Sequence, residues 1–144
     1  MKTFFNLQES NKKLNDQIVL AAGESYEVWE LLKIPAVRSG NLIIHEMNVH
    51  GLAFNAHHSD LWHCNIELRK RGIEIVLRKS DDRFVWCIPF YQMSVFQSTH
   101  LTTHANGYFI RLKNGYSLRQ AYVQRMLEMK NEYLQYPPTS THFS

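Results

Sequence analysis

The sequence predicts a mainly β domain of the α+β type: a curved antiparallel sheet, or a partly open barrel, with a C-terminal helix packed on one face. Three observations indicate this fold. Apolar and polar residues alternate along residues 62–69 and again along 73–78, with a glycine-containing turn between them. A longer apolar and aromatic stretch, 83–97, follows after a turn rich in aspartate. An amphipathic pattern with helical spacing occupies residues 117–135.

Length and composition indicate one domain over residues 1–136, followed by a flexible tail at 137–144. A chain of 144 residues can bury a continuous core without disulfide or metal cross-links. The net charge of +3 contains no long block of one sign, so we do not expect a nucleic-acid partner. No apolar run is long enough for a secretory signal or a membrane span, and we therefore expect a cytoplasmic protein.

The first predicted hairpin has its turn at Arg71-Gly72. This turn places Leu68 opposite Ile75, and it places Ile66 opposite Leu77. All four apolar side chains then share one face of the sheet. A slip of one residue would divide them between the two faces, which supports the register.

The second predicted hairpin has Asp81-Asp82 as its turn residues, which places Trp86 opposite Leu77. In this register Cys64 points toward the core and Cys87 points away from it, with a strand between the two. We therefore expect no disulfide between them.

The C-terminal helix is predicted to begin after Ser117, which serves as N-cap together with Gln120 three residues later. Pro137-Pro138 ends the helix. The apolar stripe that should face the sheet contains Leu118, Tyr122, Met126, Met129 and Tyr133, widened by Val123, Leu127 and Leu134.

The first half of the chain gives weaker patterns. Gln17–Ala22 and Asn41–Val49 are typical of strands, and Leu52–Asn55 fits a short strand. Tyr26–Lys33 is compatible with either a helix or a strand. The segment between Ser98 and Gly107 is predicted to be a loop.

Five histidines lie close together in the sequence and form the candidate metal ligands: His45, His50, His57, His58 and His63. Imidazole is a common ligand of zinc and of other transition metals, and Cys64 adds a thiol beside the last histidine. The spacing matches neither HExxH nor CxxC, and adjacent strand residues such as His63 and Cys64 point to opposite faces. We expect no cofactor. The alternative is a small metal-binding protein or a metal-dependent enzyme, with a cupin-like barrel.

Arg69, Lys70 and Arg71 form a basic hairpin tip. Such a tip could bind an anion, a phosphate group or a nucleic acid. The alternative is a solvated turn, because three cations give a weak attraction at physiological salt.

The sequence contains few catalytic patterns. Cys64 or Cys87 could pair with a histidine as a nucleophile, but the mid-strand position of Cys87 is typical of a packing residue. The chain has neither a GxSxG nucleophile elbow nor a glycine-rich phosphate loop. We therefore expect a protein that is not an enzyme.

Three segments of the second half resemble the pleckstrin-homology-like superfamily, especially its small bacterial members. They are the hairpin NIELRKRGIEIVLRK, the phrase CIPFYQMSVF, and GYFIRLKNG followed by the helix. The resemblance implies a bent, nearly closed sheet capped by the C-terminal helix. It also implies a binding or scaffolding module, whose partner is a protein or a small ligand. The eukaryotic lipid-binding members use basic residues in their first hairpin, whereas the basic tip here belongs to a later one. An open sheet edge could also support a homo-oligomer.

Overall fold

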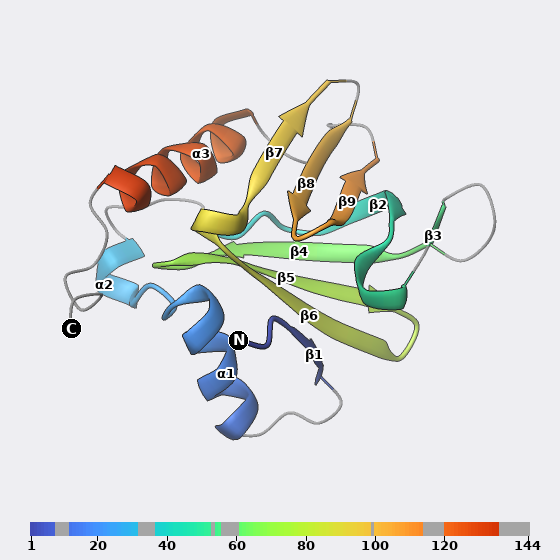
Figure 1. The fold of residues 1–144 in the computed structure, drawn as a ribbon, viewed down its shortest axis with the longest axis horizontal. Helices are drawn as coiled ribbons and strands as arrows, with labels where there is room; N and C mark the ends of the chain where they lie inside the picture. The colour runs from blue at the N-terminus through green and yellow to red at the C-terminus, as the bar shows by residue number, and fades with distance from the viewer. Residues whose placement is uncertain are drawn as a thin grey trace.

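The computed structural model describes residues 1–7, 12–31, 37–52, 54–55, 61–98, 100–113 and 120–135. It confirms a mainly β fold, in which a curved antiparallel sheet stays open and carries a C-terminal helix (Figure 1). The strands are β1 (Phe4–Asn6), β2 (Leu42–Met47), β3 (Phe54–Asn55), β4 (His63–Leu68), β5 (Gly72–Lys79), β6 (Asp82–Pro89), β7 (Ser94–Gln97), β8 (Leu101–Ala105) and β9 (Tyr108–Leu112). The helices are α1 (Lys12–Ala22), α2 (Val28–Leu31) and α3 (Gln120–Gln135), with short 3-10 turns η2 (Val49–Gly51) and η3 (Phe90–Gln92).

Strand β2 joins two antiparallel meanders into one sheet. The order of the strands is β1-β6-β5-β4-β2-β9-β8-β7, and β3 pairs with β2 off this path. The beginning of β2 pairs with β4, and its end pairs with β9. The register between β2 and β9 shifts between Ile44 and Glu46. This irregularity bends the sheet, so that β7, β8 and β9 stand away from β4, β5 and β6 (Figure 1).

The inner face of the sheet carries the main hydrophobic core. All six residues predicted to share one face belong to it: Ile66, Leu68, Ile75, Leu77, Trp86 and Ile88. Helix α3 adds the buried side chains of Tyr122, Val123 and Met126. The helix therefore packs on the sheet through the predicted stripe, except at Leu134, which is 48% exposed. Ser117, Leu118 and the two prolines lie outside the described residues.

Tyr122 fixes the position of α3. Its hydroxyl oxygen lies 3.0 Å from the carbonyl oxygen of Ile66 and 3.1 Å from that of Val37. The side chain is buried, and this burial raises the pKa of the Tyr122 hydroxyl. A neutral donor between two carbonyls thus links the helix to β4.

A second core covers the outer face of the sheet, and it corrects the prediction of a strand at Gln17–Ala22. That segment is the end of α1, whose buried face packs against β5 and β6. This second core contains Phe5, Leu14, Ile18, Ala21, Ala22, Val85 and Cys87. Both cysteines are free and buried, on opposite faces of the sheet, as predicted.

The first hairpin has the predicted faces but a different register. Leu68 pairs with Ile73, not with Ile75, so the turn residues are Lys70 and Arg71. Gly72 belongs to β5, where a Cβ atom would lie only 2.3 Å from the carbonyl oxygen of Ile88. The glycine therefore serves a close approach of two strands and does not form the turn.

The second hairpin is also shifted by two residues. Leu77 pairs with Phe84, not with Trp86, and the turn residues are Ser80 and Asp81. Ser80 adopts a positive φ of 53°. A slip of two residues preserves the alternation of faces, which explains why the predicted core is right although both turns are wrong.

The remaining predictions have mixed outcomes. The strands expected within Asn41–Val49 and Leu52–Asn55 are β2 and β3, and the ambiguous segment Tyr26–Lys33 contains α2. The predicted loop after Ser98 is wrong in part, because it contains β8. Within the described ranges, no helix combines the length and the apolar character needed to cross a bilayer.

Candidate functional site

His50 lies in an aromatic stack that bridges the open side of the sheet. Its ring centroid is 4.6 Å from that of Phe4 on β1 and 4.0 Å from that of Tyr108 on β9. Trp86 presents its edge to both His50 and Tyr108, at 6.5 Å. Partial burial among these rings lowers the pKa of His50. These contacts join two strands that are far apart in the strand order, and they give His50 a structural role.

The other described candidate histidines have separate partners. His45 stacks on His100, with centroids 4.5 Å apart. His63 lies on β4, where its Nδ1 is 3.2 Å from the side-chain nitrogen of Asn41. In the described part of the chain, no three His, Cys, Asp or Glu residues are grouped so that they could hold a metal ion. His57 and His58 lie outside the described residues, so the metal site stays a prediction.

The basic hairpin tip packs against the end of α1. Arg69 donates to the carbonyl of Gly23 at 2.9 Å, and Arg71 donates to that of Val19 at 3.0 Å. Positive charge at the carboxyl end of a helix is favourable because the last carbonyls carry partial negative charge. The two arginines therefore act as caps of α1.

The same tip contains two ion pairs. Arg69 lies 3.4 Å from Glu74, with both side chains mostly buried, and Lys70 lies 3.2 Å from Glu30. Burial raises the pKa of Glu74, and the neighbouring Arg69 acts against this shift. These intramolecular contacts leave the tip less available to an external anion than the sequence suggests.

The two cysteines lack the environment of a nucleophile. Burial raises the pKa of both the Cys64 and the Cys87 thiols to about 12. Both thiols are therefore protonated at neutral pH, whereas a reactive cysteine requires the thiolate.

Strand β7 forms one end of the sheet, and no strand of the described residues pairs with its outer edge. The N–H of Ser98 donates to the carbonyl of His100, in register with the pairing of Phe96 and Thr102. Hydrogen-bonded pairs recur at every second residue of an antiparallel ladder. The N–H of Phe96 therefore points toward β8, and those of Val95 and Gln97 point away from the sheet.

The composition of β7 does not protect this edge. Edge strands commonly carry charged residues or proline, which block pairing with another chain. β7 reads Ser-Val-Phe-Gln, without a charge or a proline, and Phe96 is 60% exposed. The described hydrogen bonds from α3 lie at the two ends of β7: Gln120 bonds to Gln97, and Lys130 donates to the carbonyl of Met93 beside Ser94.

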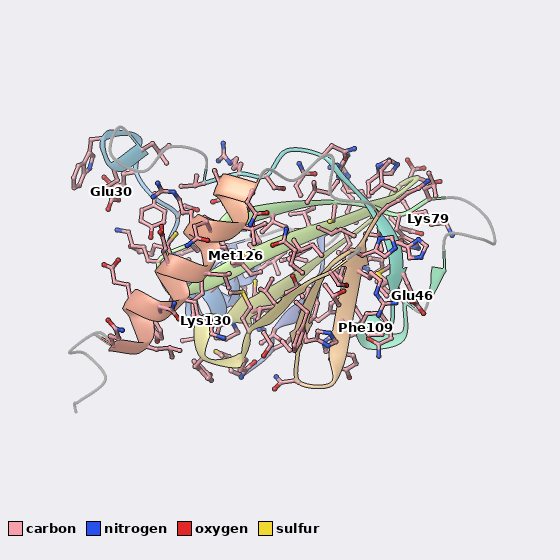
Figure 2. The ribbon with its side chains drawn as sticks, turned by 90° about the horizontal axis from the view of Figure 1, so that it is seen from above. Glu30, Glu46, Lys79, Phe109, Met126 and Lys130 are labelled. Carbon is pink, nitrogen blue, oxygen red and sulfur yellow. The ribbon has the colours of Figure 1, made fainter. Side chains whose placement is uncertain are left out.

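An aromatic stripe crosses the outer face beside this edge; it consists of Phe96, His104, Phe109 and Arg111. Phe96 meets His104 edge-on at 5.2 Å, and His104 lies 5.9 Å from Phe109. Arg111 lies over Phe109 and also forms an ion pair with Glu46. In Figure 2, α3 lies at one end of the sheet, and Glu46 and Phe109 lie toward the other, away from the helix.

The stripe was missed at the level of the sequence. The alternation of Phe109 and Arg111 with Tyr108, Ile110 and Leu112 predicts a strand at Tyr108–Leu112, and β9 confirms it. The partners on β7 and β8 could not be assigned because β8 was expected to be a loop. Thr102 and Thr103 are buried there, so the strand lacks the usual alternation of apolar and polar residues.

Comparisons of the chain with protein-family models, with curated proteins and with solved structures found no match.

Proposed function

We propose that this protein is a non-enzymatic binding module that captures an extended segment of a partner protein as an added strand on β7. The observation that carries this proposal is an uncharged terminal strand with an exposed phenylalanine at its centre. Strand addition derives its affinity from main-chain hydrogen bonds and its specificity from alternate side chains. β7 offers the outward N–H groups of Val95 and Gln97 for the main-chain hydrogen bonds.

The aromatic stripe provides the side-chain contacts that would give specificity. A segment added to β7 places every second side chain on the outer face, next to Phe96. Aromatic and β-branched residues give the most favourable cross-strand pairs with an exposed aromatic ring. We therefore expect a partner with such a residue opposite Phe96.

The chain as a whole also supports a binding module. The bent sheet with its C-terminal helix fits the resemblance to the pleckstrin-homology-like superfamily, whose members usually act through binding or scaffolding. The two thiols are free and buried, which is typical of a reducing compartment, so the proposal places the protein in the cytoplasm.

The test is a selection from a displayed library of random 12-residue peptides, followed by fluorescence-polarisation measurements with the enriched sequences. Gln97→Pro removes an outward N–H, and it leaves the bonds between β7 and β8 in place because proline is tolerated at an open edge. We expect roughly tenfold or weaker binding to this variant. Phe96→Ser removes the exposed ring and should weaken binding several-fold.

The matched control is Trp29→Ser. Trp29 is 61% exposed, as Phe96 is, but it lies on α2. The control should bind the selected peptides like the wild type. Selected peptides that bind equally well to Gln97→Pro would overturn the proposal, and so would a library that yields no binder.

A further inference from the structure

A cluster of polar side chains lies on the outer face where β2, β4 and β5 meet. We call it the Arg78 cluster; it consists of Asn41, His63, Asn65 and Arg78. Nη2 of Arg78 donates to the side-chain oxygens of both Asn41 and Asn65. The remaining side-chain atom of Asn41, its nitrogen, lies 3.2 Å from Nδ1 of His63.

This network fixes the role of each atom. Because the oxygen of Asn41 accepts from Arg78, its nitrogen faces His63 and must donate. Nδ1 of His63 is therefore an acceptor, and the proton of the neutral ring resides on Nε2. Two amides and a histidine thus hold the guanidinium in one orientation.

The hydrogen-bonding capacity left in the cluster consists largely of donors. Both amide oxygens and Nδ1 of His63 already have a donor. The contacts of the described residues use only Nη2 of Arg78, which leaves Nε and Nη1. The side-chain nitrogen of Asn65 and Nε2 of His63 are further donors. A ligand that accepts several hydrogen bonds at once would complement this arrangement.

Among the described strand residues, basic side chains also lie opposite one another at the cluster. Arg78 lies directly opposite His63 on β4 and Arg83 on β6, so three basic side chains share one row. Arg78 and Arg83 carry like charges in opposed positions, and such charges repel. In the described ranges, the glutamates that form ion pairs engage Arg38, Arg69, Lys70 and Arg111, outside this row. Asp82 faces Lys79 across the hairpin, on the other face from Arg78.

We propose that the Arg78 cluster binds a phosphate group, with Arg83 at its border. The tetrahedral phosphate oxygens accept charge-assisted hydrogen bonds from guanidinium and imidazole donors that converge from one side. The second core, to which α1 contributes, reaches Val76, which pairs with Asn65 at the border of the cluster. Asn41 is exposed and His63, Asn65 and Arg78 are half-buried, so the cluster is accessible to a ligand. The site lies away from β7, and it does not depend on the strand addition proposed above.

The test is a titration of the protein with inorganic phosphate, at an ionic strength held constant with sodium chloride, followed by ¹H–¹⁵N NMR. The side-chain amides of Asn41 and Asn65 should shift in a saturable way. Arg78→Gln should weaken binding roughly tenfold or more, because it removes the central charged donor. Since this variant also loses contacts to the two asparagines, Arg83→Gln serves as a second variant. Arg83 is exposed, and its loss should weaken binding several-fold without disturbing the network.

The matched control is Lys79→Gln, which removes one positive charge from the neighbouring position of β5 but from the opposite face. Its binding should stay within about twofold of the wild type, because the charge is screened and makes no direct contact. The proposal is wrong if phosphate causes no shifts beyond those of chloride. Equal weakening by Lys79→Gln and Arg78→Gln would also overturn it, since that result indicates a general charge effect.

Two further probes distinguish the sources of the phosphate group. Glycerol 3-phosphate represents a soluble ester, and vesicles of phosphatidylcholine with phosphatidic acid represent a lipid headgroup. Binding of either that is weakened by Arg78→Gln supports the site and identifies its source. Vesicle binding that Arg78→Gln leaves unchanged counts against it.

Discussion

The imidazole ring of His50 stacks on the phenol ring of Tyr108, with the two centroids 4.0 Å apart. His50 adopts a left-handed backbone conformation, with φ 42° and ψ 47°. This conformation is uncommon outside glycine, but histidine tolerates it better than most residues. It turns the ring into the space between Phe4 and Tyr108, where it links the first strand to the ninth.

The first prediction concerns the dependence of stability on pH. Burial lowers the pKa of His50 in the folded protein below its ordinary value of 6.5. As the pH falls, the unfolded chain therefore takes up the proton first. The stabilisation from His50 is complete above about pH 6.5 and declines as the pH falls toward the lower folded-state pKa.

The measurement is the free energy of unfolding in urea between pH 8 and pH 5, for the wild type and for His50→Asn. Asparagine tolerates the left-handed backbone but does not titrate. The variant should be less stable at pH 8, and its stability should fall less steeply with decreasing pH. Parallel pH profiles for the two proteins contradict the prediction.

The second prediction concerns Gly72. Gly72→Ala places a methyl group 2.3 Å from the carbonyl oxygen of Ile88, and β5 and β6 must separate to accommodate it. We expect a loss of about 3 kcal/mol in the free energy of unfolding, comparable with other severe steric substitutions.

Gly107→Ala is the control for Gly72. Gly107 has a φ of 84°, but its added Cβ meets no atom within 4 Å. Only backbone strain opposes this substitution, and we expect a loss of about 1 kcal/mol. Equal losses for the two variants would show that the strands do not approach as closely as described.

The third prediction concerns the ion pair of Arg69 and Glu74. Arg69→Met leaves the carboxylate of Glu74 mostly buried without its partner, and we expect a loss of about 3 kcal/mol. The double variant Arg69→Met, Glu74→Leu should recover a large part of this loss, because no unpaired buried charge remains. A double variant that is less stable than the single one would indicate that the pair itself stabilises the fold.

The fourth prediction concerns the hydroxyl of Tyr122. Tyr122→Phe keeps the packing of the ring but leaves the carbonyls of Val37 and Ile66 without this donor. We expect a loss of about 1 to 2 kcal/mol, measured by thermal or urea unfolding. Tyr91→Phe is the control, since Tyr91 is 57% exposed and its variant should be as stable as the wild type.

The sequence was sufficient to predict which face of each central strand is buried, but not the pairing of the strands. Ile66, Ile75 and Trp86 share the inner face in any register shifted by an even number of residues. The choice among these registers depends on contacts between strands. The approach of Gly72 to Ile88 and the positive φ of Ser80 are examples that residue types alone do not reveal.

Helix α1 could have been predicted from its end. Leu14, Ile18 and Ala22 recur at helical spacing, and Gly23 follows with a φ of 85°. The N–H of Gly23 donates to the carbonyl of Val19 at 2.8 Å, which is the bond of a glycine cap. The apolar run from Ile18 to Ala22 is short enough to fit a buried strand equally well.

Prediction of the candidate sites required knowledge of the tertiary structure to a greater extent than prediction of the buried faces. His63 was correctly expected on the face opposite to Cys64, but its partner Asn41 belongs to another strand. The edge at β7 became visible only with the strand order. An open edge is a property of the whole sheet, and the local sequence of a strand carries little information about it.

The most direct test of the proposed binding mode is amide hydrogen exchange by NMR, with and without a peptide selected from the library. We predict that the N–H groups of Val95 and Gln97 exchange rapidly in the free protein and are strongly protected in the complex. The N–H of Phe96 should be protected in both states, because it faces β8. Unchanged exchange at Val95 and Gln97 in a saturated complex would contradict strand addition at β7.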